Sequence, residues 1–497
     1  PGSCQGEDAV KVLQQNTYCY QSYVTIYRDT MFGGMFNVTD ICEPLERDFD
    51  SAGFWIVILI MLAFLACITA ASIRTQYLSE LEAKNLEISE FHLLRDQLRN
   101  AIDEDNEHSP SHKREGHNKL KPARPRNVYD DHWFLQCFSI QHLWKIFTAR
   151  RPADKSQFNF LDGIRVASMS WVIYGHVYIL FLMSSPSNQA TMMPFSADAK
   201  PYPYEFTKFY MMFAEYAFYS VDSFFYLSGF LAAFAIYRQL ERYGVDKNGR
   251  SKAIRLWYTW IPLAYINRVL RLLPMMTFVM MVQWFVADQL PYSYRVTSRD
   301  ANAQLCSNSW YAVLFFYANL KKDMDDLGCM GHLWYIQCDM QMYLLLPFLV
   351  LLFKWKKVIG VSVSFLLFLA GIGVRTYNAI HYHFGANFLQ PANEFINDGS
   401  QQEQYFKPWT RMAPYFVGVF TMFIILTLKD KKLSPKPFEI HHRSVFFSIM
   451  ALGMFTMCCL VFWPYNDIKD APEERWSLAA NQAYYAMSRP AWGAALG

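Results

Sequence analysis

The sequence predicts an all-α fold, a polytopic bundle of transmembrane helices preceded by a small cysteine-containing segment. Hydrophobic residues make up 53% of the 497 residues and charged residues only 18%, whereas charged residues average about 25% in soluble domains. The apolar residues gather in runs of the length that a helix needs to cross a hydrocarbon core about 30 Å thick. This composition excludes a disordered chain, and a net charge of +3 excludes a nucleic-acid footprint.

Eight or nine apolar stretches are candidate membrane spans. The first, residues 53–73, has no charged residue between Asp50 and Arg74. The last begins near Ala483 and is cut off. The others are residues 164–183, 209–237, 256–287, 332–353, 358–377, 412–428 and 444–463. Because the chain starts at Pro1 without a methionine and stops within an apolar run, we expect it to be truncated at both ends.

Lysine and arginine predict the orientation of the spans, because cytosolic loops carry an excess of these residues. Positive charges gather in residues 95–151, 238–255, 354–357 and 429–432, and acidic residues gather in 323–326 and 467–474. The first set of loops is therefore expected in the cytosol. The N-terminus is then extracytosolic, at the plasma membrane or in the endoplasmic reticulum.

Two features of the N-terminal segment agree with this orientation. Asn37 begins an Asn-x-Thr glycosylation sequon. The segment also holds three cysteines, in a compartment where disulfides form: Cys4, Cys19 and Cys42. Their odd number indicates a partner upstream of the first residue. Cys306 and Cys329 share another extracytosolic loop and are a candidate disulfide pair.

The region after the first span is predicted to form a helix followed by a linker. Apolar residues recur at steps of three and four across residues 75–104, which predicts an amphipathic helix continuing from the span. A packing or dimer stripe fits this pattern, and so does a helix covering the membrane surface or the core, which we favour. The basic run 112–126 resembles a flexible linker near anionic lipid. We therefore divide the chain into an extracytosolic segment (1–52), a first span (53–73), a cytosolic helix with linker (74–155) and a transmembrane domain (156–497).

Polar residues inside apolar stretches are candidate functional residues. A charge at the bilayer centre costs roughly 2.5–3.5 kcal/mol on insertion scales, so it needs a partner or a task. Arg165 lies at the cytosolic mouth of a span. His176 lies eleven residues further, about 16 Å deeper in a helix and near the bilayer centre. Histidine takes up and returns protons near neutral pH, as a general base must, although a packing histidine also fits.

Two further groups admit more than one interpretation each. Asp222 lies in an apolar stretch, where it can orient His176, pair with an arginine or make a purely structural contact. Arg268 and Arg271 are three residues apart and share a helical face near the cytosolic edge. A pair of guanidinium groups suits phosphate, but arginines at this depth are also ordinary membrane anchors.

Three other residues are weaker candidates. Ser228 is followed by Gly229 within an apolar helix, a pair that permits close approach of another helix. His332 and Asp339 lie near the outer end of a span, where each can also simply face water.

The order of these residues resembles the acyltransferase-3 family of integral membrane acyltransferases. The resemblance rests on Arg165 and His176, Ser228-Gly229-Phe230, Arg268-x-x-Arg271 and His332-Leu333-Trp334. Further segments are similar to the animal, nose-resistant-to-fluoxetine branch: Leu161 to Trp171, Asp339-Met340-Gln341, Lys407 to Tyr415 and Ser488 to Trp492. The likeness runs from about residue 135 to the end. The N-terminal segment resembles the end of that branch's cysteine-rich domain.

The resemblance implies transfer of an acyl group from acyl-CoA, on the cytosolic side, to a hydroxyl of a lipid or small-molecule acceptor. It implies His176 as the catalytic group, for which Asp222 is a candidate orienting residue, and Arg165, Arg268 and Arg271 as the acyl-CoA-binding residues. The expected partners are membrane lipid, acyl-CoA and an unidentified acceptor, with no metal and no nucleic acid. Direct transfer and an acyl-histidine intermediate both stay open.

The alternative is a transporter or lipid-handling protein on the same helices, with Asp222 and His176 lining a substrate path. No inverted repeat of helices broken by glycine or proline is evident in the sequence, which disfavours this alternative. A membrane protein that has lost its chemistry is a third interpretation, against which the four candidate residues Arg165, His176, Arg268 and Arg271 argue.

Overall fold

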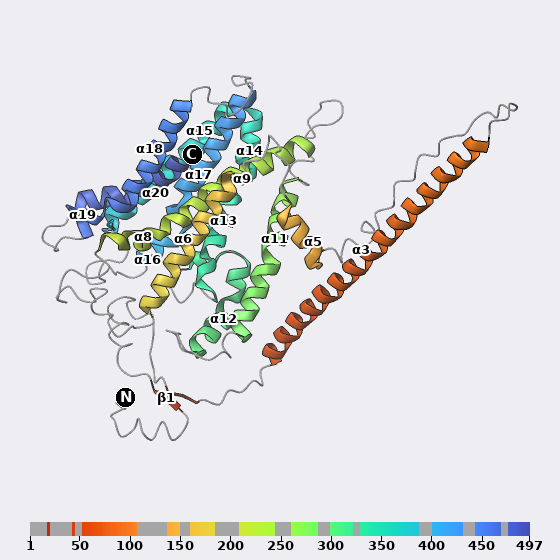
Figure 1. Ribbon diagram of the computed structural model, residues 1–497. Coiled ribbons are helices and arrows are strands. Elements are labelled where there is room, and N and C mark those ends of the chain that lie inside the picture. The colour runs from red at the N-terminus through yellow and green to blue at the C-terminus, as the bar shows by residue number, and fades with distance from the viewer. Residues whose placement is uncertain are drawn as a thin grey trace. The chain divides into compact units, whose positions relative to one another are not determined.

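The computed structural model describes residues 17–19, 42–44, 52–106, 137–149, 160–183, 208–243, 260–286, 299–321, 329–386, 400–430, 443–468 and 476–497. Contacts divide the chain into two units, Asp50–Gln157 on the one hand and Pro1–Phe49 with Phe158–Gly497 on the other. Helices make up nearly all of the described residues, as Figure 1 shows. The all-α fold class predicted from the sequence is confirmed.

A short hairpin is the described part of the N-terminal segment. Strand β1 (Thr17–Cys19) pairs antiparallel with β2 (Cys42–Pro44), and the register places Cys19 opposite Cys42. The other two predicted features of this segment, Cys4 and the sequon at Asn37, lie outside the described residues.

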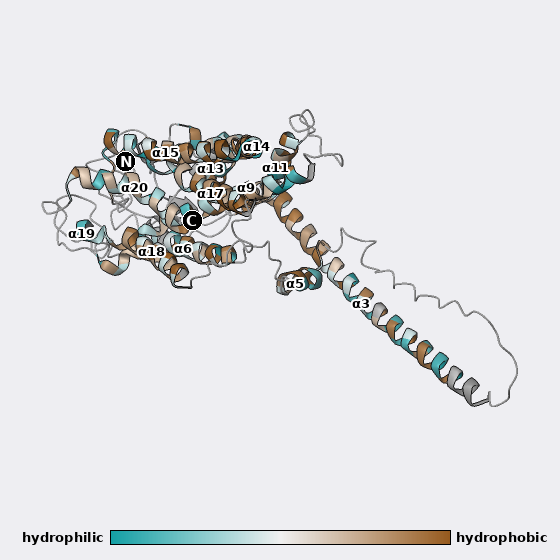
Figure 2. Ribbon diagram, turned by 90° about the horizontal axis from the view of Figure 1, so that it is seen from above, coloured by the Kyte–Doolittle hydropathy of each residue, from teal (hydrophilic) through white to brown (hydrophobic). Residues whose placement is uncertain are grey.

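The unit Asp50–Gln157 contains one long helix and one short one. Helix α3 (Ala52–Asn106) runs without a break from the predicted first span into the predicted amphipathic helix. Figure 2 shows its apolar beginning and its mixed polar and apolar continuation. Helix α5 (Ile140–Thr148) starts at Ser139, whose Oγ accepts a hydrogen bond from the backbone N–H of His142 (3.3 Å) and so caps the helix. The backbone N–H of Ile140 donates to Ser72 Oγ (3.1 Å), which ties α5 to α3.

The other unit is a bundle of helices. Its long helices are α6 (Phe160–Met183), α9 (Tyr219–Tyr243), α11 (Ile261–Met281), α15 (Lys357–His381), α17 (Pro408–Asp430), α18 (Arg443–Phe462) and α20 (Leu478–Leu496). Shorter helices are α8 (Met212–Glu215), α12 (Arg299–Leu314), α13 (Trp334–Tyr343), α14 (Leu346–Trp355), α16 (Ser400–Tyr405) and α19 (Tyr465–Ile468). Single turns of 3₁₀-helix are η3 (Phe209–Met211), η4 (Tyr216–Phe218), η8 (Ala318–Leu320) and η10 (Gly331–Leu333), and η6 (Val282–Val286) is π-helical.

Seven helical segments of the described chain are long and apolar enough to cross a membrane. They are Ala52–Arg99, Phe209–Glu241, Ile261–Val286, Gly331–Trp355, Lys357–His381, Glu403–Leu428 and Phe447–Asp467. Two of the nine predicted spans are helices outside this set, α6 and α20. Both are helices, as the sequence predicts, and both carry charged side chains, such as Asp162 in α6 and Arg489 in α20. The chain is thus a multi-pass membrane protein.

Helices α9 and α17 form the centre of the bundle and lie side by side (Figure 1). A glycine on each helix faces the backbone of the other. A Cβ added at Gly229 would lie 2.2 Å from the carbonyl oxygen of Tyr415, and one added at Gly418 would lie 2.3 Å from that of Tyr226. Such reciprocal contacts require glycine, because any side chain would force the helices apart.

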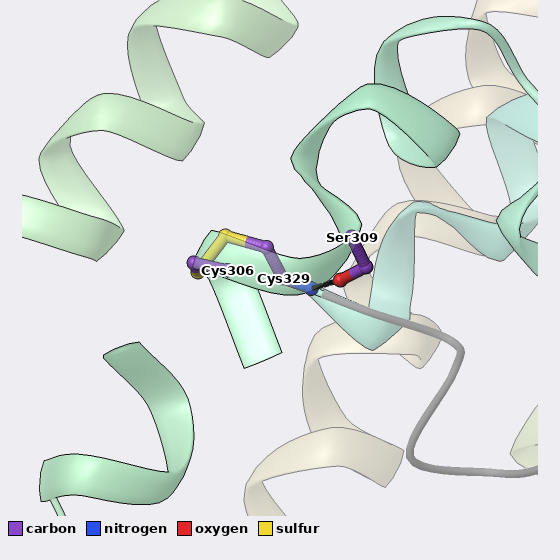
Figure 3. Close-up of a disulfide and its surroundings, with 3 residues drawn as sticks. All are labelled: Cys306, Ser309 and Cys329. Atoms are coloured by element: carbon purple, nitrogen blue, oxygen red, sulfur yellow. Dashed lines mark hydrogen bonds between the residues drawn. A yellow bond between two sulfur atoms is a disulfide. The ribbon is translucent and has the colours of Figure 1, made fainter. Parts of the chain in front are cut away.

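A disulfide joins the candidate pair Cys306 and Cys329 (Figure 3). Cys306 lies in α12, and Cys329 lies two residues before the span Gly331–Trp355. The backbone N–H of Cys329 also donates a hydrogen bond to Ser309 Oγ (3.1 Å), as the figure shows. Together these contacts fix the start of that span against α12.

Candidate functional site

A cavity of about 510 Å³ lies among helices α9, α11 and α13. One face of α9 provides much of its wall, since lining residues recur every three or four positions from Phe224 to Gln239. Helix α11 contributes a second face of the same kind, from Ala264 to Arg271. Small residues of α9 line the space, Ala232 and Ala235 among them. The three helices therefore leave a hollow inside the bundle.

The cavity brings together all three arginines that the sequence singles out. Arg268 and Arg271 line it from α11, and Arg165 lines it from α6. Asp339 is the acidic residue among the lining residues, so the wall carries more positive than negative charge. A space of this kind suits a ligand that bears several negative charges.

Arg268 and Asp339 form an ion pair in the wall, with 9% and 11% of their side chains exposed. The hydroxyl of Ser228 donates a hydrogen bond to Asp339 Oδ1, and Arg268 Nη2 lies 3.4 Å from the Ser228 oxygen. The guanidinium carbon of Arg268 lies 4.0 Å from the centre of the Tyr343 ring, a cation–π arrangement. The structure thus unites Ser228, Arg268 and Asp339 in one polar cluster across α9, α11 and α13.

The other two arginines of the cavity are more accessible. Arg165 pairs with Asp162 at 2.9 Å, but both side chains are about half exposed, and such surface pairs are weak. Arg271 is exposed, and among the described residues no ion pair includes it. Arg165 and Arg271 are therefore available to an incoming anion, whereas Asp339 already neutralises Arg268.

His176 lies outside the lining of this cavity. Its side chain is exposed on α6, and Nδ1 lies 2.8 Å from the carbonyl oxygen of Val172. Because a carbonyl only accepts, Nδ1 carries the proton, which leaves Nε2 with a free lone pair. The imidazole is therefore held in the tautomer that a general base needs.

His332 is the other histidine near His176. It lies in η10 just before α13, is exposed, and interacts electrostatically with the His176 ring. Helix α6 is held beside the start of the Phe209–Glu241 segment by Trp171, whose Nε1–H donates to the carbonyl oxygen of Phe213 (2.7 Å). The indole of Trp171 also stacks on the Phe213 ring. The two histidines thus lie within electrostatic range of each other, one on α6 and one in the turn before α13.

Asp222 is fully buried and is bound by arginines rather than by His176. Arg411 Nη1 of α17 lies 3.0 Å from Oδ1, and Arg489 Nε of α20 lies 3.8 Å from Oδ2. Of the interpretations open to Asp222, the structure shows the arginine pair. Among the described residues, no contact joins this carboxylate to the imidazole of His176.

A group of buried arginines was not among the functional residues predicted from the sequence. Arg375, Arg411 and Arg489 are each at most 2% exposed, and all three act on or contact Asp222. A signal was present, since Arg375 is a charge inside the predicted span 358–377. Tyr335 and Tyr343 of the cavity wall were also overlooked, because aromatic residues are common throughout this chain.

The chain is similar to two proteins of Caenorhabditis elegans. It is 26% identical over 377 residues to "Nose resistant to fluoxetine protein 6" of Caenorhabditis elegans, across 73% of this chain and 43% of that protein. It is 24% identical over 312 residues to "Regulator of hypoxia-inducible factor 1" of the same species, across 59% of this chain and 56% of that protein. The chain therefore spans about half the length of the curated relatives it matches. No solved structure matches the chain.

A family model described as an acyltransferase domain matches residues 158–493. The match begins just before α6 and ends within α20, so it includes every helix that contributes to the cavity. It covers well over half of the sequence, and the chain therefore belongs to the acyltransferase-3 family of membrane acyltransferases.

Proposed function

We propose that this protein transfers an acyl group from acyl-CoA to a hydroxyl of a lipid or small-molecule acceptor. The observation that carries the proposal is the cavity whose wall holds three arginines against one aspartate. Coenzyme A bears several phosphate groups, which guanidinium groups bind through charge-assisted hydrogen bonds. The arrangement therefore favours a phosphorylated donor over an apolar lipid alone.

The two accessible arginines are the proposed phosphate ligands. Arg165 is half exposed and Arg271 is exposed, so neither loses a strong partner when it binds phosphate. Arg268 is more buried and is held by Asp339, and its proposed task is to shape the inner wall beside Ser228. The expected donor site therefore extends from Arg165 and Arg271 toward the Ser228 cluster.

The same cavity fits the orientation expected from the sequence. Arg165 lies near the start of α6, and Gln239 lies near the end of α9, next to the predicted cytosolic loop 238–255. Lys354 and Glu241 form an ion pair at this end of the bundle (3.6 Å). We therefore propose that the donor enters from the cytosol and that the N-terminal segment lies on the opposite side.

The proposed general base is His176. Its Nε2 is free to take the proton of an acceptor hydroxyl, and the developing imidazolium keeps its hydrogen bond from Nδ1–H to Val172. Arg165 lies eleven residues before it on α6, about 16 Å along the helix axis. The pantetheine arm of the donor spans a distance of this order, so phosphate at Arg165 and a thioester near His176 are compatible.

A turnover experiment tests the proposal. The purified protein is incubated with labelled acyl-CoA and extracted lipids, and the products are examined for a new ester. We expect His176→Ala to lower the rate about 10²–10⁴-fold, the usual contribution of a general base. His381→Ala is the matched control, because His381 is an exposed histidine of α15 that stacks on Tyr377 away from the cavity.

Two outcomes contradict the proposal. A His176→Ala protein that folds, reaches the membrane and transfers acyl groups at the wild-type rate removes the assigned base. A wild-type protein that moves lipid across vesicles at the same rate with and without acyl-CoA, and forms no ester, identifies a transporter instead.

A further inference from the structure

A second polar region of the bundle, separate from the cavity, holds an unbalanced charge. It consists of Asp222 and three arginines, Arg375, Arg411 and Arg489, contributed by α9, α15, α17 and α20. Three of these side chains have no exposed surface, and Arg489 is 2% exposed. Counted over these four described residues, three guanidinium groups and one carboxylate carry a net charge of +2, and a buried unpaired charge is strongly destabilising.

The guanidinium groups are only partly satisfied. Arg411 uses Nη1 for Asp222 and Nε for the carbonyl oxygen of Tyr405 (2.8 Å). Within the described part of the chain, three nitrogen atoms nevertheless have no hydrogen-bond partner: Arg375 Nη1, Arg411 Nη2 and Arg489 Nη1. Asp222 Oδ2 also accepts no hydrogen bond there, and Arg489 Nε lies 3.8 Å from it. Buried polar groups in native proteins are nearly always bonded, so these three N–H groups point to a missing acceptor.

Arg375 is held in place by the backbone of α20. Its Nε donates to the carbonyl oxygen of Ala486 (3.3 Å), and its Nη2 donates to that of Tyr485. The carbonyl of Ala486 lacks its usual helical partner, because Pro490, four residues further, has no N–H. Two donors of Arg375 are thus committed, and Nη1 remains.

A small cavity adjoins the arginines. It measures about 10 Å³, and Arg375, Arg489 and Ser488 are among its lining residues. A space of about 10–15 Å³ holds roughly one water-sized species. Glu403 is a second acidic residue whose charge acts on Tyr485. It accepts a hydrogen bond from Trp409 Nε1 (2.8 Å), and among the described residues it forms no ion pair with these arginines.

We infer that this cluster binds a single small inorganic anion of the size of chloride. An anion in the small cavity supplies both the negative charge and the acceptor that Arg375 and Arg489 lack, whereas a water molecule supplies no charge. Because Arg375 and Arg489 line the small cavity from two different helices, a bound anion ties α15 to α20. Chloride is then part of the folded bundle.

The test measures the melting temperature of the purified protein in sodium chloride and in sodium gluconate at the same ionic strength. A ligand that binds the folded state alone raises stability with the logarithm of its concentration, so we expect about 2 °C for each tenfold increase in chloride above the Kd. Bromide, which is similar in size, is expected to act in the same way. Equal melting temperatures in chloride and gluconate overturn the inference.

Two variants of the cluster are expected to change the chloride dependence of the melting temperature in opposite directions. Arg375→Gln removes one positive charge and is expected to abolish the chloride dependence, whereas Asp222→Asn adds one net positive charge and is expected to strengthen it. Arg238→Gln is the matched control, because Arg238 is an exposed arginine of α9 that stacks on Phe234 and leaves the cluster intact. An Arg375→Gln protein with the full chloride dependence contradicts the site.

A second measurement uses only the wild-type protein, so it tests the inference even if the variants fail to fold. Crystals of the wild-type protein grown in bromide are expected to show an anomalous peak between Arg375 and Arg489. The absence of that peak from well-ordered maps also overturns the inference.

Discussion

The ion pair of Arg268 and Asp339 provides the sharpest test of the cavity's architecture. Both side chains are about nine-tenths buried, and Ser228 donates to the same carboxylate. Asp339→Leu leaves the buried guanidinium without its ion-pair partner, and Arg268→Met leaves the buried carboxylate without its own. Each single variant is expected to lose about 3–5 kcal/mol of the free energy of unfolding.

The double variant, Arg268→Met with Asp339→Leu, is expected to recover most of this loss. It removes both charges and replaces them with apolar side chains of similar size, a change that is often neutral for buried pairs. What remains is the hydrogen bond of Ser228, whose loss costs about 1 kcal/mol. The double variant is therefore expected to be more stable than either single variant.

Equilibrium unfolding of the purified protein in mixed micelles measures these differences. The control is Glu241→Gln, which breaks the Lys354–Glu241 pair, because those side chains are 43% and 48% exposed. Solvent screens such pairs, so the control is expected to lose less than about 1 kcal/mol. The reasoning is refuted if Asp339→Leu costs no more than the control, or if the double variant costs the sum of the two single variants.

Two other predictions concern the donor site and the packing beneath it. Arg271→Ala is expected to weaken acyl-CoA binding about 10–100-fold, the value of one charged hydrogen bond, without changing the melting temperature; unchanged affinity removes Arg271 from the donor site. Gly418→Ala is expected to lower the free energy of unfolding by about 1–3 kcal/mol or more, because its Cβ would meet the Tyr226 carbonyl. Gly373→Ala is the control: its Cβ would meet no atom within 4 Å, so little effect is expected. Thermal unfolding of both glycine variants compares these costs.

The fold was largely predictable because a membrane span can be identified from the length of its apolar run. Runs of about 20 apolar residues identify the helices without knowledge of their partners. Helices α6 and α20 were predicted in the same way, although neither is among the seven apolar segments of the described chain. These two helices carry polar side chains that the bundle itself accommodates, as the contacts of Trp171 in α6 and Arg489 in α20 show.

The site was predictable in its residues but not in its grouping. Arg165, Arg268 and Arg271 stood out as charges at the ends of apolar stretches, and the structure gathers them around one cavity. The partner of Arg268 was not predictable, since Asp339 lies 71 positions away and the pair depends on how α11 meets α13. Asp222 posed the same problem, because Arg411 lies 189 positions away.

Helix α9 connects the two charged regions of the bundle. Asp222, in the buried arginine cluster, and Ser228, in the cavity wall, lie six residues apart on this helix, about 9 Å along its axis. Gly229, the residue after Ser228, is where α17 touches the backbone of α9. A variant that unbalances the charge around Asp222 and displaces α9 there is therefore expected to displace Ser228 as well, because both residues lie on one continuous helix. It follows that variants of the arginine cluster must be judged by their melting temperature before any change in acyl transfer is assigned to chemistry.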